Sequence, residues 1–394
     1  MALPSATASL NNSLKCWKYL GIWPDGKHKT MYRCYSSAYI FIVLILYNIQ
    51  QTLSLYYAPR KIELMIKEIT FFFNVLAITN CVFMILYRKK TIIKIFKALD
   101  SEQFQGTDIV TKNILMKDVA HYKMYWKGLV GLGNFAYTLN SVVPIIANLA
   151  ITSYQLQLPT FNYYFLSDSI KKEYFGFLYA YEFFSIYGIM MYDVTTDSFI
   201  NGMLFFSITQ MKILNNKFRN LKTEINSKLS RDEQERIHVT KLKECLRHYD
   251  SILTYCSDVQ SIINFIMFVK FGLGSLLICV LLCGLLLPQT MESIMFMLFY
   301  SMAMVLQIFV PCWLGTQLTY QSQELVFAAY NSDWIPRTEP FKRSVKVFME
   351  RAKTPVVIIG FKLFPLSLET FTSIMKTAYS FVTLVRNFQE EAET

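Results

Sequence analysis

Seven stretches of this sequence are apolar, almost free of charge and about 20 residues or more in length, which is what a helix needs to cross a bilayer. They cover residues 34–59, 69–87, 128–152, 174–205, 260–286, 293–318 and 366–388. Only 17% of the chain is charged and 53% is hydrophobic, whereas soluble domains carry about 25% charge. The sequence therefore predicts an all-α polytopic membrane protein with seven transmembrane helices.

The distribution of lysine and arginine predicts how these helices are oriented. With a cytoplasmic N-terminus, 31 of the 39 basic residues fall on the cytoplasmic side and five on the outside. Cytoplasmic loops of membrane proteins carry such an excess. We therefore expect the N-terminus inside and the C-terminus outside. G-protein-coupled receptors have the opposite orientation, so the charge bias argues against that class.

The apolar stretches divide the chain into membrane and cytoplasmic parts. Residues 205–258 keep apolar positions at helical spacing with charges on the other face, so we expect the fourth and fifth spans to continue as helices into the cytoplasm. Residues 338–358 read as a short amphipathic helix. The predicted parts are a cytoplasmic N-terminus (1–34), spans one to four (35–205), a cytoplasmic helical extension (206–259), spans five and six (260–318), a cytoplasmic segment (319–365), span seven (366–388) and an extracellular tail (389–394).

The sequence offers no pattern for catalysis, a cofactor or a metal. All four histidines lie outside the spans, and no metalloprotease, nucleophile-elbow or phosphate-loop motif occurs. Cys279 and Cys283 are one helical turn apart, but they belong to a stripe of small residues that suits close helix packing. We expect no enzyme activity, no cofactor and no metal. The net charge of +11 is read as membrane orientation, not as a nucleic-acid surface.

Several ionisable residues lie inside the spans, where charge is costly and is usually turned toward protein or water. They either make buried polar contacts or take part in moving ions or protons, and we expect Glu182 to line a water-filled vestibule. The set is Glu182, Asp193, Asp197, Lys270, Glu369 and Lys376.

The outer halves of spans two, three, four and six are rich in aromatic and aliphatic residues with isolated polar groups. This composition suits a pocket for a small apolar ligand, although aromatic residues at helical spacing also serve for packing. The candidate ligand-binding residues are Phe72, Phe73, Leu76, Ser141, Ile145, Asn148, Phe183, Ile186, Tyr187, Met190, Phe299 and Tyr300.

The last span has two different faces. One is polar and runs from Glu369 through Ser373, Lys376, Ser380 and Thr383 to Asn387. The other carries Met375, Tyr379, Val382 and Arg386, with Val385 beside it. Neither face is uniformly suited to lipid, so this helix is expected to lie among protein or water.

The chain resembles insect odorant receptors. The resemblance rests on the topology and on the segments PCWLGTQLTYQSQELVFAAYNSDW (311–334) and KTAYSFVTLVRNF (376–388), with Thr-Asp-Ser at 196–198. Related gustatory receptors end in a Thr-Tyr motif followed by Gln-Phe, where this chain has Ala378-Tyr379 and Val385-Arg386. The odorant branch is favoured, and the chain is short for a co-receptor.

The resemblance implies a ligand-gated, non-selective cation channel in the plasma membrane of an olfactory neuron dendrite. A tuning subunit of this kind assembles with odorant co-receptor subunits into a heterotetramer and binds a small volatile in the outer pocket. Its last helix lines the pore, with Val382 at a hydrophobic gate, which would close by dewetting. The pore or gate residues are Met375, Tyr379, Val382, Val385 and Arg386, and the polar face is assigned to packing against neighbouring spans.

Three alternatives remain open at this stage. A gustatory-type chemoreceptor channel differs in the C-terminal motif and in its dependence on a co-receptor. A G-protein-coupled receptor needs the N-terminus outside. A secondary transporter predicts stoichiometric substrate flux without channel openings.

Overall fold

The computed structural model describes residues 6–23, 29–106, 108–150, 156–222, 230–287 and 291–393, and the part of the chain that it describes is almost entirely helical. The helices are α1 (Ala6–Tyr19), α2 (Lys29–Ile40), α3 (Tyr47–Tyr57), α4 (Ile62–Tyr87), α5 (Lys89–Leu99), α6 (Glu102–Gln105), α7 (Ile109–Tyr137), α8 (Val143–Ala150), α9 (Asp168–Glu173), α10 (Phe175–Arg219), α11 (Arg231–Gly284), α12 (Met291–Tyr330), α13 (Glu339–Ala352) and α14 (Leu368–Glu393). Two π-helical turns, η1 (Phe41–Leu46) and η2 (Thr138–Val142), join α2 to α3 and α7 to α8, and a 3-10 turn, η3 (Asn220–Lys222), follows α10.

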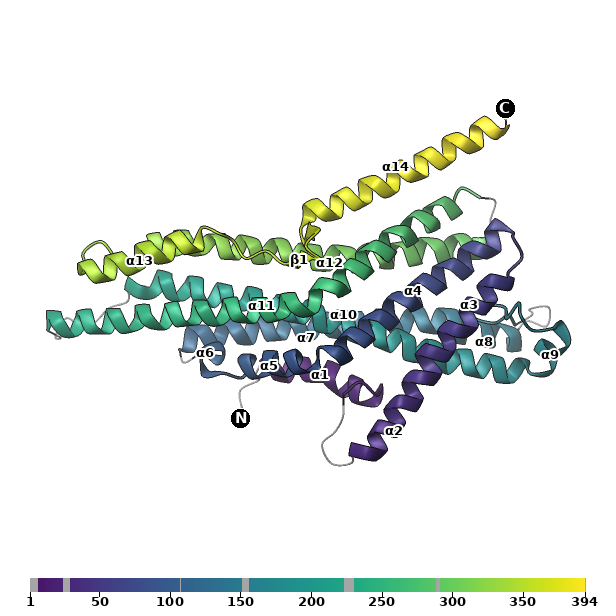
Figure 1. Ribbon diagram of the computed structural model, residues 1–394, viewed down its shortest axis with the longest axis horizontal. Helices are drawn as coiled ribbons and strands as arrows, with labels where there is room; N and C mark the ends of the chain where they lie inside the picture. The colour runs from purple at the N-terminus through teal and green to yellow at the C-terminus, as the bar shows by residue number, and fades with distance from the viewer. Residues whose placement is uncertain are drawn as a thin grey trace.

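The long helix α10 is the centre of the fold. It packs against α1, α4, α7, α11 and α12, and these helices run roughly along the long axis of the molecule (Figure 1). From Val194 to Leu204 every residue of α10 is buried. A helix surrounded on all sides in this way needs no apolar stripe, which explains why its polar and apolar residues alternate without a clear period.

Five helical stretches are long and apolar enough to cross a membrane by length and composition: Thr30–Tyr57, Leu64–Tyr87, Ile109–Ala150, Asp232–Gly284 and Ile294–Tyr330. The other two predicted spans correspond to α10 and α14, which have 45 and 26 residues and are not among these five stretches. Several helices extend beyond the apolar stretches. The one predicted over 128–152 begins at Ile109, because the charged residues before it lie on a continuous helix.

One end of the molecule is a helical bundle built from the ends of α10, α11 and α12 together with α13. Ser230 starts α11 with a capping box that pairs it with Glu233. The ring of Phe348 on α13 stacks on Phe218 of α10, with ring centres 4.5 Å apart, and meets Tyr249 of α11 edge-on at 5.1 Å. Aromatic rings thus join α13 to two of the long helices.

The last helix leaves the body through a short joint. A two-residue antiparallel pair, β1 (Ile359–Gly360) and β2 (Phe364–Pro365), lies against α11, where Gln260 bonds the amide of Ile359 at 2.8 Å. Gly315 of α12 faces the carbonyl oxygen of Leu366 so closely that a Cβ there would lie 2.1 Å from it. From this joint α14 projects away from the other helices (Figure 1).

The side chains of α14 correct one sequence expectation. The polar residues from Glu369 to Asn387 are exposed, so they do not pack against neighbouring helices of this chain as predicted. The packed side is formed by Phe371, Ile374, Met375 and Ala378, because an apolar side gains more from contact with the apolar α12.

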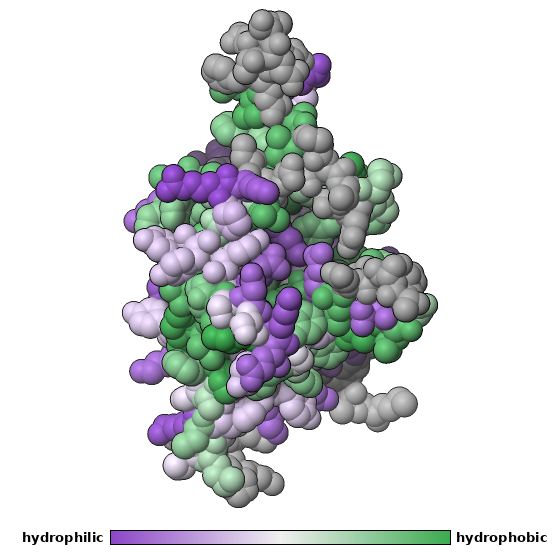
Figure 2. Space-filling model, turned by 90° about the vertical axis from the view of Figure 1, so that its right-hand side faces the viewer, coloured by the Kyte–Doolittle hydropathy of each residue, from purple (hydrophilic) through white to green (hydrophobic). Residues whose placement is uncertain are grey.

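The end of the molecule opposite the α13 bundle carries α9 and the turn between α3 and α4. Figure 2 shows this end, where hydrophilic residues gather near the middle and hydrophobic residues lie at the flanks. A polar end flanked by apolar surface is typical of a membrane protein that emerges into water.

Candidate functional site: a polar cavity among four helices

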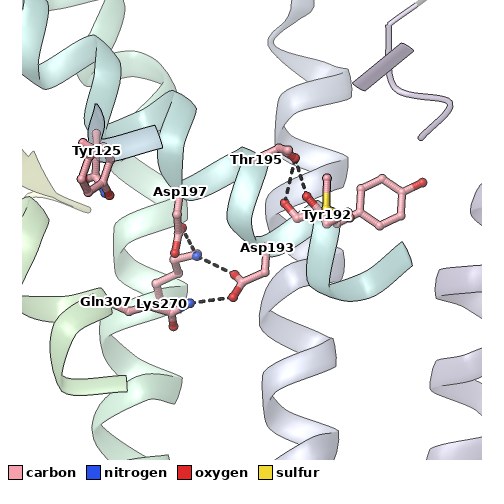
Figure 3. A network of polar contacts seen from close by, with 9 residues as sticks. Tyr125, Tyr192, Asp193, Thr195, Asp197, Lys270 and Gln307 are labelled. Carbon is pink, nitrogen blue, oxygen red and sulfur yellow. Dashed lines mark hydrogen bonds and ion pairs between the residues drawn. The ribbon is translucent and has the colours of Figure 1, made fainter. Parts of the chain in front are cut away.

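Four side chains form a buried polar network in the middle of the apolar bundle. The ammonium group of Lys270 on α11 lies 3.1 Å from Oδ1 of Asp193 and also contacts Asp197 one turn further along α10. Gln307 of α12 donates from Nε2 to Oδ2 of Asp193 at 2.6 Å. Figure 3 shows that the network joins three helices. These ionisable residues of the fourth and fifth spans therefore make buried polar contacts, one of the two readings that the sequence allowed.

A small cavity adjoins this network. Its polar lining consists of Asn74 of α4, Asp193, Lys270 and Gln307, and its apolar lining comes from α4, α11 and α12. Pro311 follows Gln307 by one turn of α12 and has no N–H that could donate to the backbone carbonyl of Gln307. The cavity has about 20 Å³ of space, which suits one water molecule. In this conformation it is too small for an organic ligand.

Aromatic rings lie beside the cavity where α4 meets α12. Tyr300 packs on Phe296 with ring centres 5.5 Å apart and on Phe71 at 6.2 Å. Its hydroxyl oxygen is buried and interacts with the side chain of Asn74, which lines the cavity. Tyr300 is thus an aromatic residue from the predicted set whose hydroxyl reaches the polar lining of the cavity.

A second aromatic group lies where α7 meets α10. Tyr137 contacts the rings of Phe183 and Tyr187 at 5.4 and 5.1 Å, and its hydroxyl donates to the carbonyl of Phe183 at 3.1 Å. Ser141, in the π-helical turn η2, accepts through its carbonyl from Tyr179 at 2.8 Å. Such turns occur frequently at functional sites.

None of the twelve residues predicted to bind ligand lines the small cavity. Phe299 is 58% exposed and points outward, and Asn148 and Tyr187 are exposed as well. Ser141 is buried. The remaining members are partly buried: Phe72, Phe73, Leu76, Ile145, Phe183, Ile186, Met190 and Tyr300.

The structure corrects the expectation for Glu182. Instead of lining a vestibule, this residue is fully buried and accepts two hydrogen bonds from Thr160. The sequence analysis missed Asn74, Tyr137 and Gln307. The available signal was the same for Asn74 and Gln307, since each is an amide within a mainly apolar, charge-free stretch of its helix.

The five residues predicted for the pore or gate all lie on α14. Tyr379 is 73% exposed and Arg386 is exposed, while Val382, Val385 and Met375 are partly covered. Met375 is packed against the body of the chain. Among the described residues, no group of three or more His, Cys, Asp or Glu is arranged to hold a metal, Cys279 and Cys283 included.

Comparisons with known proteins give a consistent result. A family model described as "7tm Odorant receptor" matches residues 61–379. Odorant receptor 10 of Aedes albopictus is 28% identical over 50% of this chain and 52% of its own length, so the match spans about half of that relative. Odorant receptor 30a of Drosophila melanogaster is 23% identical over 95% of this chain and 94% of its own.

The fold also matches a solved structure. The insect olfactory receptor OR5 from Machilis hrabei, determined in complex with eugenol, superposes with a TM-score of 0.82 over 96% of this chain and 97% of that chain. The two sequences are 17% identical. The likeness is therefore one of fold.

Proposed function

Because this chain belongs to the seven-transmembrane odorant receptor family, we propose that it is the odorant-binding subunit of a ligand-gated, non-selective cation channel. Membership makes it a multi-pass membrane receptor and not an enzyme. The proposal extends to assembly with odorant co-receptor subunits as a heterotetramer in the plasma membrane of an olfactory neuron dendrite, with the N-terminus in the cytoplasm.

The observation that carries the proposal is the exposure of α14. This helix presents Tyr379, Phe381 and Leu384 outward together with its polar face, and only one side of it touches the rest of the chain. Lipid does not suit an exposed polar face, because polar groups in hydrocarbon are costly. A helix with both kinds of exposed surface fits a place between partner subunits and a water-filled pore.

In the proposed channel, α14 helices from neighbouring subunits surround the pore. Val382 forms the hydrophobic constriction, with Tyr379, Val385 and Arg386 along the same side, and the constriction closes by dewetting. Met375 contributes less to the lining of the pore, because its side chain packs on the rest of its own chain.

The proposed ligand is a small, volatile and mainly apolar molecule. It binds among α4, α7, α10 and α12, where Phe183, Tyr187 and Tyr300 supply aromatic surface. The cavity beside Asp193 holds only about one water molecule, so binding requires rings such as that of Tyr300 to move apart. Burial of a ligand of about 10 heavy atoms supports an affinity in the micromolar range.

The test is whole-cell current in cells that express this chain with and without an odorant co-receptor, under a panel of volatiles. The expected result is a cation current that needs both subunits and a ligand. Tyr300→Phe is expected to change the ligand response about 3- to 10-fold, since it removes one buried hydroxyl. Tyr56→Phe, which removes a hydroxyl at an exposed position of α3, is the matched control.

Two outcomes would contradict the proposal. Current in cells that lack any co-receptor would reject the heteromeric assembly. Stoichiometric uptake of a substrate without single-channel openings would indicate a transporter. An engineered glycosylation site near residue 8 checks the orientation, because glycosylation there would place the N-terminus outside.

A further inference from the structure

A run of basic residues follows the second membrane span directly. The apolar stretch Leu64–Tyr87 ends with α4. Residues 88–97, the basic segment, contain five cations: Arg88, Lys89, Lys90, Lys94 and Lys97. No acidic residue occurs between Glu68 and Asp100. The charge bias of the whole chain predicts that this end of α4 lies in the cytoplasm, so positive charge is concentrated where the chain leaves the bilayer on that side.

Helix α5 turns most of this charge away from the protein. Lys90, Lys94 and Lys97 recur at helical spacing along one side of the helix, and all three are exposed. The opposite side is apolar and buried against the rest of the chain, through Ile92, Ile95, Phe96 and Leu99. Because its apolar side is already covered, α5 meets its surroundings mainly through lysine side chains.

Most of the charge of the basic segment is not neutralised within the described part of the chain. Lys94 forms an ion pair, with its ammonium group 2.9 Å from a carboxylate oxygen of Asp258 on α11. The other four cations form none with any residue that the structure describes. Lys90 and Lys97 are about 10 Å apart along the helix, which is comparable to the distance over which salt screens exposed charges. These like charges therefore repel one another, and an anion from outside the chain relieves the repulsion.

Aromatic rings accompany the two cations nearest to the bilayer. The guanidinium group of Arg88 lies 5.5 Å from the ring centre of Tyr87, which is 78% exposed. The ammonium group of Lys89 lies 4.9 Å from the ring centre of Trp23, a residue between α1 and α2. Tyrosine and tryptophan are enriched where a membrane meets water. These contacts support a position of the corner between α4 and α5 at the level of the lipid headgroups.

The amount of charge indicates the kind of anion. Four uncompensated cations exceed the single net negative charge of a lipid such as phosphatidylserine. A headgroup with additional phosphate groups carries several negative charges, and lysine and arginine bind phosphate oxygens through charge-assisted hydrogen bonds. Clusters of about four to eight basic residues immediately cytoplasmic of a membrane helix are typical of sites for such lipids.

We propose that the basic segment binds a phosphoinositide of the cytoplasmic leaflet, a lipid whose headgroup carries several phosphates. The acyl chains of this lipid lie in the bilayer beside α4, and its phosphates contact the corner between α4 and α5 (Figure 1). The inference rests on the proposed orientation, with the N-terminus in the cytoplasm, and does not depend on channel activity.

The site is tested on the purified full-length chain in detergent, without any measurement of current. The probe is a fluorescent, short-chain phosphatidylinositol bisphosphate, and its binding is followed by fluorescence anisotropy. Binding is expected to be saturable and to weaken as the salt concentration rises, because salt screens exposed charges. Unlabelled phosphatidylserine is expected to compete much more weakly than the unlabelled bisphosphate lipid.

Variants of two exposed lysines identify the residues responsible. Lys90→Gln combined with Lys97→Gln removes two unpaired positive charges, so the affinity is expected to fall about 10- to 30-fold. Lys90→Arg combined with Lys97→Arg keeps the charge and is expected to bind like the unchanged chain. Arg343→Gln combined with Lys346→Gln is the matched control. It removes the same charge from two exposed positions of α13, in the bundle at the far end of the molecule (Figure 1), and is expected to keep the affinity.

Unchanged affinity after the two lysines are replaced by glutamine, or an equal loss in the α13 control, would overturn the proposal. Competition by phosphatidylserine as strong as that by the bisphosphate lipid would overturn the assignment to a headgroup with several phosphates. Glycosylation of an engineered site near residue 8 would place the basic segment outside the cell and overturn the proposed orientation together with this inference. Absence of lipid binding with the N-terminus inside overturns this inference alone.

Discussion

The inner half of α10 and the whole of α14 are helices of similar length with opposite surroundings. In α10, even Asp197 is buried, because Lys270 lies beside it. In α14, aromatic Tyr379 is mostly exposed. The difference shows that burial in this chain follows from what stands opposite a residue and not from how apolar the residue is. The inner half of α10 is covered on all sides by the same chain, whereas α14 is covered on only one side.

The largest effect is expected from a change that leaves the buried carboxylates of α10 without their cation. Lys270→Met removes the cation that faces Asp193 and Asp197 and leaves two carboxylates uncompensated. We expect a loss of about 3–5 kcal/mol in stability, measured as a large fall in melting temperature and in surface expression. Replacing all three, with Asp193→Asn and Asp197→Asn added, should restore most of it. If Lys270→Met is as stable as the unchanged chain, the contacts of Lys270 with Asp193 and Asp197 do not stabilise the fold as expected.

An effect of up to the same size is expected at the α13 bundle. Phe348→Ala removes a ring that is packed between Phe218 and Tyr249, and such truncations cost about 3–5 kcal/mol, less where the site collapses. Thermal unfolding of the purified chain measures it. Phe299→Ala, at an exposed aromatic residue, is the control and should change stability by less than about 1 kcal/mol.

A third effect depends on pH. His248 lies on α11 before its apolar span, within the predicted cytoplasmic extension, and contacts Gln210 at 3.0 Å. Burial, together with the nearby charge of Lys217, lowers the pKa of His248 from 6.5 to about 3. The unfolded chain therefore binds a proton below pH 6.5 that the folded chain does not, so stability falls as the pH drops.

Between pH 7 and pH 5 this difference is expected to remove on the order of 2 kcal/mol. The measurement is the melting temperature across that range for the unchanged chain and for His248→Gln, which should show a weaker dependence. His121→Gln, at an exposed histidine, should keep the original slope. Identical slopes in all three proteins would contradict the assignment to His248.

The smallest effect on stability is expected on α14. Tyr379→Ala changes a side chain that barely touches its own chain, so the melting temperature of the isolated subunit should stay within the equivalent of about 0.5 kcal/mol. The same variant should alter the current of the assembled channel, because the proposal places this residue at the pore. If Tyr379→Ala lowers the stability of the subunit and leaves the current unchanged, Tyr379 packs within its own chain and does not lie at the pore.

The sequence predicted the membrane fold because its main signal is local. Runs of apolar residues and the placement of Lys and Arg are read directly along the chain, and the family match and the solved fold confirm the predicted seven-helix class. The helix ends were predicted less well, since charged residues such as those before 128 continue a helix into water without changing its hydrogen bonding.

The candidate site was harder to predict because it depends on pairing between distant residues. Sequence analysis singled out Asp193, Asp197 and Lys270 as costly charges, but it could not show that Lys270 lies opposite both. Phe299 and Tyr300 are adjacent in sequence, and only one of them turns inward. A register difference of one residue on a helix decides such cases, and periodicity in an apolar helix does not reveal it.

The joint at Gly315 allows α14 to pivot about one of its ends. With 26 residues and a rise of 1.5 Å each, the helix is about 39 Å long. It is held at one end, where the backbone at Gly315 meets Leu366 and the hydroxyl of Thr316 accepts from the amide of Leu368. A tilt of about 5° at this fulcrum displaces the far end by roughly 3 Å. Small rearrangements of α12 are thereby amplified with distance from the joint.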